Sequence, residues 1–76
     1  MNIKRGQIWR RPYEENDDYI LAQVGSNTFA LISLYDGNRW AEPVECILKT
    51  DDCIRAADFR KICSGDSTFT LLKERD

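Results

Sequence analysis

Two apolar runs on either side of a short polar turn constrain the fold of this chain most strongly. Residues 18–24 (Asp-Tyr-Ile-Leu-Ala-Gln-Val) and 29–35 (Phe-Ala-Leu-Ile-Ser-Leu-Tyr) flank residues 25–28 (Gly-Ser-Asn-Thr), whose Gly and Asn tolerate a positive φ. Short runs rich in β-branched and aromatic residues around such a turn are typical of a β-hairpin. The sequence therefore predicts an antiparallel hairpin at the centre of the fold.

Pairing Val24 with Phe29 across this turn predicts which side chains share a face, because paired residues lie on the same face and faces alternate along each strand. One predicted face holds Ile20, Ala22, Val24, Phe29 and Leu31. The other holds Tyr19, Leu21, Ile32 and Leu34, with Gln23 and Ala30 towards the turn. Both faces are apolar, whereas a half-exposed antiparallel sheet alternates apolar with polar residues. The second face is therefore covered by a helix, by coiling of the sheet, or by a partner, either another copy of the chain or a target protein.

The segments around the hairpin predict three further strands. Residues 3–10 predict a first strand with a bend or bulge at Gly6. A tight turn at residues 36–38 (Asp-Gly-Asn) leads into a return strand made by Arg39-Trp40 and residues 43–48. Residues 68–73 alternate as a closing strand.

A change of period predicts a short helix before the closing strand. Thr50, Asp51 and Asp52 offer capping side chains ahead of this run. The apolar positions of the expected helix are Ile54, Ala57, Phe59, Ile62 and Cys63. Arg60 and Lys61 in its last turn suit the helix dipole, and Ser64 with Gly65 is expected to end it.

This order of elements predicts a mainly β fold over residues 1–76 as a single domain. Four strands, one short helix and a last strand are typical of a small, partly open, five-stranded SH3-like barrel. The alternative is an α+β sheet with one packed helix.

Composition narrows the functions that the chain can have. Its 76 residues include eleven Lys plus Arg, thirteen Asp plus Glu and no His, so the commonest metal ligand and general base is missing. The sequence contains no Cys-x-x-Cys pair and no Gly-rich phosphate loop. We therefore expect no enzyme activity, no cofactor and no metal site.

The cysteines and the absence of targeting signals predict a compartment. Cys46, Cys53 and Cys63 are expected to be reduced thiols, two or three of which pack as small hydrophobic residues. No signal peptide is recognised at the start of the sequence. No apolar run approaches the roughly 20 residues that span a bilayer. We expect a cytoplasmic protein that does not contact a membrane.

The charges are segmented although the formal net charge is only −2. Residues 1–12 carry four basic side chains and no acid, residues 14–18 carry four acids and no base, and residues 36–52 are acidic again. One interpretation is solvated loops and strand faces. The other is a basic first strand that binds an acidic partner or a phosphate backbone, weakened by the neighbouring acids.

Aromatic and arginine side chains gather near the predicted turns, which is the usual composition of a binding hot spot. The candidate binding residues are Trp9, Arg10, Arg11, Tyr13, Tyr35, Asp36, Asn38, Arg39 and Trp40. For the two tryptophans the alternative is a place in the core, and for residues 36–38 it is a plain tight turn. A guanidinium beside an indole, as in Arg39-Trp40, can clamp a carboxylate, a phosphate or a base. Arg10 and Arg11 join this patch if the first loop folds near it.

Two segments resemble known families. Residues 3–9 (Ile-Lys-Arg-Gly-Gln-Ile-Trp) resemble the first strand of PemK/MazF-like ribonuclease toxins, which begin with a similar string on an SH3-like barrel. Those toxins are longer and have further strands and an Arg-Pro segment after the first loop, so their nuclease activity does not carry over. Residues 19–44, through Asp-Gly-Asn-Arg-Trp to Glu-Pro-Val, resemble short uncharacterised phage and mobile-element proteins, and are loosely similar to Tudor and other royal-family barrels. The phage-like resemblance implies a compact accessory protein that binds a host or viral target.

These patterns favour a non-enzymatic binding module, encoded by a phage or mobile element, that recognises a protein through its aromatic loops. It is also expected to self-associate through the second face of the hairpin. The alternative is a nucleic-acid-binding barrel that uses Lys4, Arg5, Arg10, Arg11 and Arg39. A third, more distant alternative is a degenerate ribonuclease-like toxin.

Overall fold

A computed structural model describes residues 2–13, 15, 17–49 and 53–74 of the chain. Within these ranges the chain is mainly β, with one short helix directly before the last strand, as the sequence predicts. The strands are β1 (Ile3–Lys4), β2 (Ile8–Arg10), β3 (Asp18–Gly25), β4 (Thr28–Ser33), β5 (Val44–Glu45), β6 (Cys53–Ile54) and β7 (Thr70–Lys73), and the helix is α1 (Ala56–Ile62).

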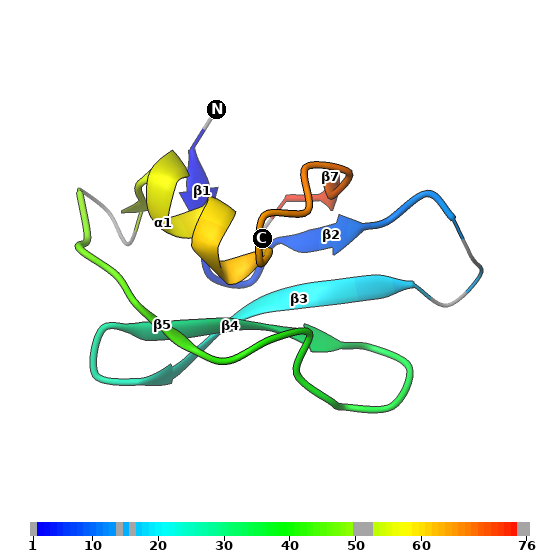
Figure 1. The fold of residues 1–76 in the computed structure, drawn as a ribbon, viewed down its shortest axis with the longest axis horizontal. Helices are drawn as coiled ribbons and strands as arrows, with labels where there is room; N and C mark the ends of the chain where they lie inside the picture. The colour runs from blue at the N-terminus through cyan, green and yellow to red at the C-terminus, as the bar shows by residue number, and fades with distance from the viewer. Residues whose placement is uncertain (1, 14, 16, 50–52, 75–76) are drawn as a thin grey trace.

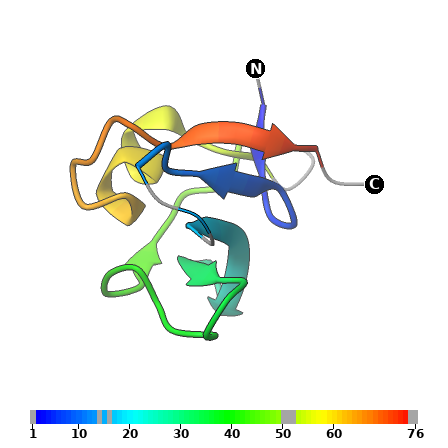
Figure 2. The same cartoon turned by 90° about the vertical axis from the view of Figure 1, so that its right-hand side faces the viewer.

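Five strands form one antiparallel sheet in the order β5-β4-β3-β2-β7, and β1 pairs with β6 in a separate two-stranded sheet. The larger sheet does not close into a barrel. Figures 1 and 2 show α1 and β1 on the same side of the sheet that β3 and β4 form. We call the sheet face turned away from α1 the outer face.

The central hairpin of β3 and β4 is confirmed, but its predicted register is wrong by one residue. Phe29 pairs with Gln23 rather than with Val24. The turn between the strands contains only two residues, and one of them, Asn27, has a positive φ of 58°. Val24 lies at an irregularity in the pairing of the two strands. A tighter turn and this irregularity move every later pair along by one position.

A shift of one residue exchanges the two faces of a strand. Leu21, Phe29 and Leu31 therefore face the core, where each is at most 1% exposed. Ile20 and Ile32, which pair with each other, lie on the outer face and are partly exposed. The predicted second apolar face exists, but with a different set of residues.

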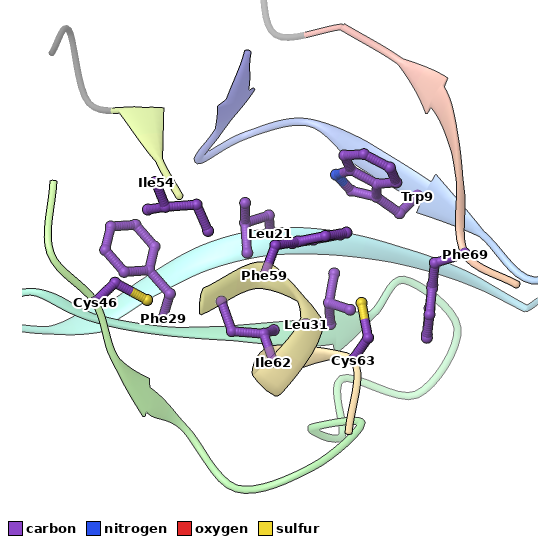
Figure 3. Packing of buried hydrophobic residues seen from close by; sticks show 10 residues of the cluster. All are labelled: Trp9, Leu21, Phe29, Leu31, Cys46, Ile54, Phe59, Ile62, Cys63 and Phe69. Carbon is purple, nitrogen blue, oxygen red and sulfur yellow. The ribbon is translucent and has the colours of Figure 1, made fainter. Parts of the chain in front are cut away.

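The core lies between the inner face of the sheet and α1 (Figure 3). Its buried members are Trp9, Leu21, Phe29, Leu31, Cys46, Ile54, Phe59, Ile62, Cys63 and Phe69. The rings of Trp9 and Phe59 have centroids 4.4 Å apart and join β2 to the helix. All three cysteines are buried and none of them forms a disulfide, which confirms that they pack as small hydrophobic residues.

The predicted first strand is broken in two at Gly6, whose φ of +91° suits glycine better than any other residue. The break lets the two pieces pair with different partners: Ile3 lies opposite Ile54 of β6, while Ile8 lies opposite Ile20 of β3. A single strand over residues 3–10 could not reach both.

The helix begins later than predicted. The expected cap at residues 50–52 lies outside the described residues, and Ile54 is in β6 rather than in the helix because its backbone pairs with β1. The helical residues start at Ala56. The C-terminal end is as predicted, with Arg60 and Lys61 in the last turn and positive φ values at the two residues that follow Cys63.

The return strand is shorter than predicted, because β5 contains only two residues of the expected range 43–48. In the part of the chain that the structure describes, no helix is long and apolar enough to cross a membrane.

Candidate functional site

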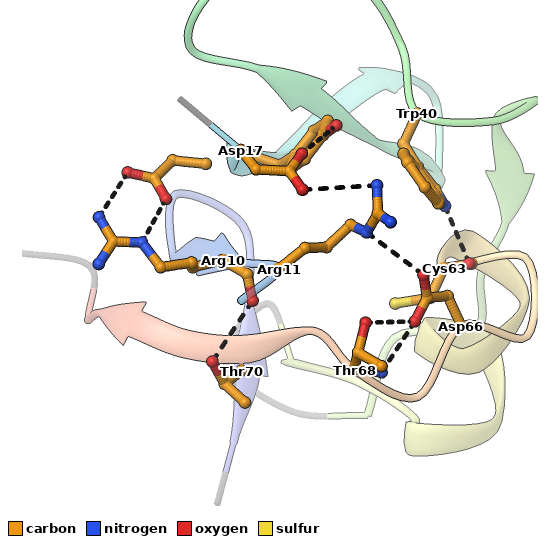
Figure 4. A network of polar contacts seen from close by, with 10 residues as sticks. Arg10, Arg11, Asp17, Trp40, Cys63, Asp66, Thr68 and Thr70 are labelled. Carbon is orange, nitrogen blue, oxygen red and sulfur yellow. Dashed lines mark hydrogen bonds and ion pairs between the residues drawn. The ribbon is translucent and has the colours of Figure 1, made fainter. Parts of the chain in front are cut away.

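Three of the predicted site residues, Arg11, Tyr13 and Trp40, lie together, and Figure 4 shows Arg11 beside Trp40. Its Cζ atom lies 4.4 Å from the centroid of the Trp40 ring and 5.5 Å from that of Tyr13. Carboxylates flank it, with Asp17 at 3.4 Å and Asp66 at 3.3 Å. The expectation that the first loop folds near Trp40 is therefore met by Arg11.

The residues around Arg11 are also tied together. The hydroxyl of Tyr19 donates a hydrogen bond to Asp17 (2.8 Å), and the indole Nε1 of Trp40 donates one to the carbonyl of Cys63 (2.9 Å). The rings of Tyr19, Trp40 and Phe69 stand edge to face, with centroids 5.3–5.6 Å apart. Burial, followed by the hydrogen bond to Asp17, raises the pKa of Tyr19, so its hydroxyl remains a donor.

The second carboxylate of the cluster is held as an anion. Thr68 donates hydrogen bonds to Asp66 from its hydroxyl and its backbone N–H. These bonds are the main reason that the pKa of Asp66 lies below its ordinary value, and Arg11 adds to the shift. One partly buried cation therefore sits between two anions and an indole ring. This arrangement fastens the first loop to the turn after α1.

Arg10 has a different environment from its neighbour. Its guanidinium binds both carboxylate oxygens of Asp18, at 2.7 and 3.1 Å, on the outer face of the sheet. Arg10 lies directly opposite Asp18 in the pairing of β2 with β3. One cation of the basic segment 1–12 and one anion of the acidic segment 14–18 thus neutralise each other across this pair of strands.

The structure separates the other predicted site residues. Trp9 is 3% exposed and lies in the core, so its ring does not reach the surface. Tyr35 is 71% exposed. Arg39 is exposed and has a long 3.9 Å contact with Glu42.

Residues 36–38 form the predicted tight turn. Asp36 accepts a hydrogen bond from the backbone N–H of Asn38 (2.9 Å), which lowers the pKa of that carboxyl, and Gly37 has a φ of +77°. The backbone N–H groups of Tyr35 and Asp36 donate to the hydroxyl of Ser33. These bonds account for the turn, so its residue types need no ligand to explain them.

A row of isoleucines crosses the outer face of the sheet, and sequence reasoning missed it. Ile8, Ile20 and Ile32 lie side by side in β2, β3 and β4 and are partly exposed; we call them the isoleucine row. Lys73 pairs with one end of the row and Arg39 with the other. The correct hairpin register would have revealed the row.

Exposed aliphatic side chains surround the isoleucine row. Leu34, directly after β4, is 52% exposed, and Leu72, in the irregular pairing of β7 with β2, is 45% exposed. Val24 at the hairpin end is 46% exposed. About half of each of these side chains is in contact with solvent, so together with the isoleucine row they add to the apolar surface of this face.

The titratable groups of the described residues do not assemble a metal site, and burial suppresses the reactivity of two of the thiols. No group of three or more His, Cys, Asp or Glu residues in the described ranges could hold a metal ion. Burial is the main cause that raises the pKa of Cys46 to about 11 and that of Cys63 to about 12. Both thiols therefore stay protonated near neutral pH.

A comparison of the chain with protein-family models, with curated proteins and with solved structures gave no match. Function is therefore argued from the chain's own surfaces.

Proposed function

We propose that this chain is a non-enzymatic, SH3-like protein-binding module, and that the outer face of its sheet is the contact surface. The single observation that carries this proposal is the isoleucine row, which crosses three neighbouring strands on the face that α1 leaves bare. Contiguous apolar surface of this kind is typical of protein interaction sites. The SH3-like assignment is supported by the open antiparallel sheet and by the helix directly before the last strand.

The charges at the ends of the row favour a particular partner. Arg39 and Lys73 are both cationic and stand at opposite ends of the isoleucine row. A second copy stacked on this face would bring like charges together whether the two rows ran in the same or in opposite directions. The proposed partner is therefore another protein that presents an apolar strip flanked by acidic groups.

The nucleic-acid alternative has less support from the described contacts. It depends on a basic surface that includes Arg10 and Arg11, and both of these side chains are ion-paired with aspartates. Binding to a phosphate backbone would have to compete with these pairs. The resemblance to short phage proteins supports an accessory role for the proposed module.

Two substitutions on the outer face test the proposal. Leu34→Glu and Leu72→Glu place a charge beside the isoleucine row without disturbing the core, since both side chains are about half exposed. We expect each variant to lose a partner that the wild type captures from host lysate. Ile47→Glu is the matched control, because Ile47 is 62% exposed and lies outside this face, in the segment that follows β5.

The same set of variants separates the possible outcomes. Capture that is lost with Leu34→Glu and Leu72→Glu but kept with Ile47→Glu supports the proposal. Equal capture by all four proteins contradicts it. Sedimentation at high micromolar concentration must show a monomer, because a dimer that Leu34→Glu dissociates would identify a second copy as the occupant instead.

A further inference from the structure

A cleft on the helix side of the molecule is not used by the proposed contact surface. It lies between α1 and residues 66–69, and its volume is about 200 Å³. Apolar side chains contribute most of its lining, among them Ile3, Ala56, Phe59 and Phe69. Sites for whole small molecules usually measure about 300–1,000 Å³, so this cleft has room for one large side chain rather than for a complete ligand.

The rim of the cleft carries one available positive charge. Arg60 and Asp66 both border it. Both oxygens of Asp66 are already engaged: Oδ1 accepts the hydrogen bonds from Thr68, and Oδ2 lies 3.3 Å from Arg11, which also pairs with Asp17. Arg60, in the last turn of α1, makes no ion pair or side-chain hydrogen bond with any residue that the structure describes. Arg60 is therefore the side chain of the rim with which an incoming anion can pair.

The thiol in the cleft does not suggest covalent chemistry. Cys63 lines the cleft, but burial raises its pKa to about 12, and a protonated thiol is a poor nucleophile. The aromatic edges of Phe59 and Phe69 instead suit a ring or a branched aliphatic group, which gains both apolar burial and edge-to-face contact.

We propose that this cleft is an anchor pocket for a peptide segment of a partner protein, and that it takes one aromatic or large aliphatic side chain with a carboxylate beside it. The carboxylate pairs with Arg60 while the apolar side chain fills the space between α1 and residues 66–69. This inference goes beyond the proposed function, because it needs neither the outer face nor the isoleucine row.

Two short probes that differ only in charge test the chemistry of the pocket. The ¹⁵N-labelled chain is titrated with acetyl-Asp-Phe-amide and with acetyl-Asn-Phe-amide, and amide chemical shifts are followed by NMR. We expect shifts confined to residues 3, 56–63 and 66–69, and an affinity about threefold to fivefold higher for the Asp probe at low salt, as for one exposed ion pair. Shifts spread elsewhere, or equal affinity for both probes, would overturn the proposal.

The helix offers neighbouring residues as matched controls. Ala56 and Arg60 line the cleft, whereas Ala57 and Lys61, the next residues along, do not. Ala56→Trp should fill the cleft and abolish binding, and Ala57→Trp should leave it unchanged. Arg60→Glu should remove the preference for the Asp probe, and Lys61→Glu should keep it.

Folding is checked separately from binding, by the dispersion of the amide spectrum of each variant. Arg60→Glu changes an exposed side chain and should fold, so it tests the proposed ion pair even if Ala56→Trp fails to fold. Binding that survives Ala56→Trp, or a preference for the Asp probe that survives Arg60→Glu, contradicts the proposal. The same changes in the matched controls, Ala57→Trp and Lys61→Glu, contradict it as well. None of these substitutions touches the outer face, so this test and the capture experiment can fail independently.

Discussion

Arg10 and Arg11 are neighbours in the sequence, but their side chains lie in different environments. Arg10 is the last residue of β2, and Arg11 is the first residue of the loop that follows. The Arg10 side chain is 51% exposed and binds one aspartate at the surface. The Arg11 side chain is 23% exposed and lies between two aspartates, against the indole of Trp40. Exposed ion pairs contribute little to stability, whereas removing one partner of a buried pair leaves an uncompensated charge.

The two arginines are therefore expected to differ in their effect on stability. Arg11→Ala should lower the free energy of unfolding by about 2 kcal/mol, because Asp17 would remain 8% exposed without its cation. Arg10→Ala should cause a much smaller loss. Urea unfolding of the two variants measures the difference, and equal losses would show that the Arg11 cluster does not hold the loop.

At the scale of elements, Asp58 connects the first turn of α1 to the segment that follows β5. Its carboxylate is 2% exposed, accepts two hydrogen bonds from the guanidinium of Arg55 (both 3.1 Å) and one from the backbone N–H of Ile47 (3.2 Å). The bond from Arg55 is the main cause that lowers the pKa of Asp58, burial opposes the shift, and the bond from Ile47 supports it. No side chain caps the start of α1, so the contacts of Asp58 hold its first turn in place instead.

This contact predicts a pH dependence of stability. A carboxyl whose pKa is lower in the folded than in the unfolded state stabilises the fold above its unfolded pKa, near 3.8, and loses that contribution as the pH falls through the folded pKa. Asp58→Asn should therefore destabilise the chain at pH 7 and much less at pH 3. Thermal unfolding at both pH values checks this, and an equal difference from wild type at the two would rule out the assigned role of Asp58.

The elements also show how much of the fold can be predicted from local sequence patterns. The central hairpin, the turn at residues 36–38 and the end of α1 follow from residue types within a few positions, and they were predicted. The pairing of β1 with β6 joins segments about fifty residues apart in the chain, and each has only two residues, so no local pattern marks it. Ile54 was therefore assigned to the helix.

The candidate site was predicted in part for the same reason. The aromatic and arginine residues near the first loop drew attention to Arg11 and Trp40, which do meet. The isoleucine row was missed because it depends on a hairpin register that one irregularity near Val24 decides. The shift of one position changes which residues share a face: Leu21 lies with Leu31, and Ile20 with Ile32.

At the scale of the whole molecule, the described part of this 76-residue chain has one helix of seven residues to cover a five-stranded sheet. That helix and the two-stranded sheet of β1 and β6 lie on one side (Figures 1 and 2). A domain of this size buries a smaller fraction of its surface than a larger one does. The outer face consequently keeps apolar side chains in contact with solvent, and the proposed function follows from that surface.

The central claim is that the isoleucine row is accessible in the isolated chain, and isoleucine methyl groups report on it directly. In a dilute sample labelled at isoleucine methyl groups, a soluble gadolinium chelate should broaden the signals of Ile8, Ile20 and Ile32 well above those of the buried Ile54 and Ile62, with exposed Ile47 as the upper reference. If the three methyl groups of the row are as protected as those of Ile54 and Ile62, the outer face is covered and the account is contradicted.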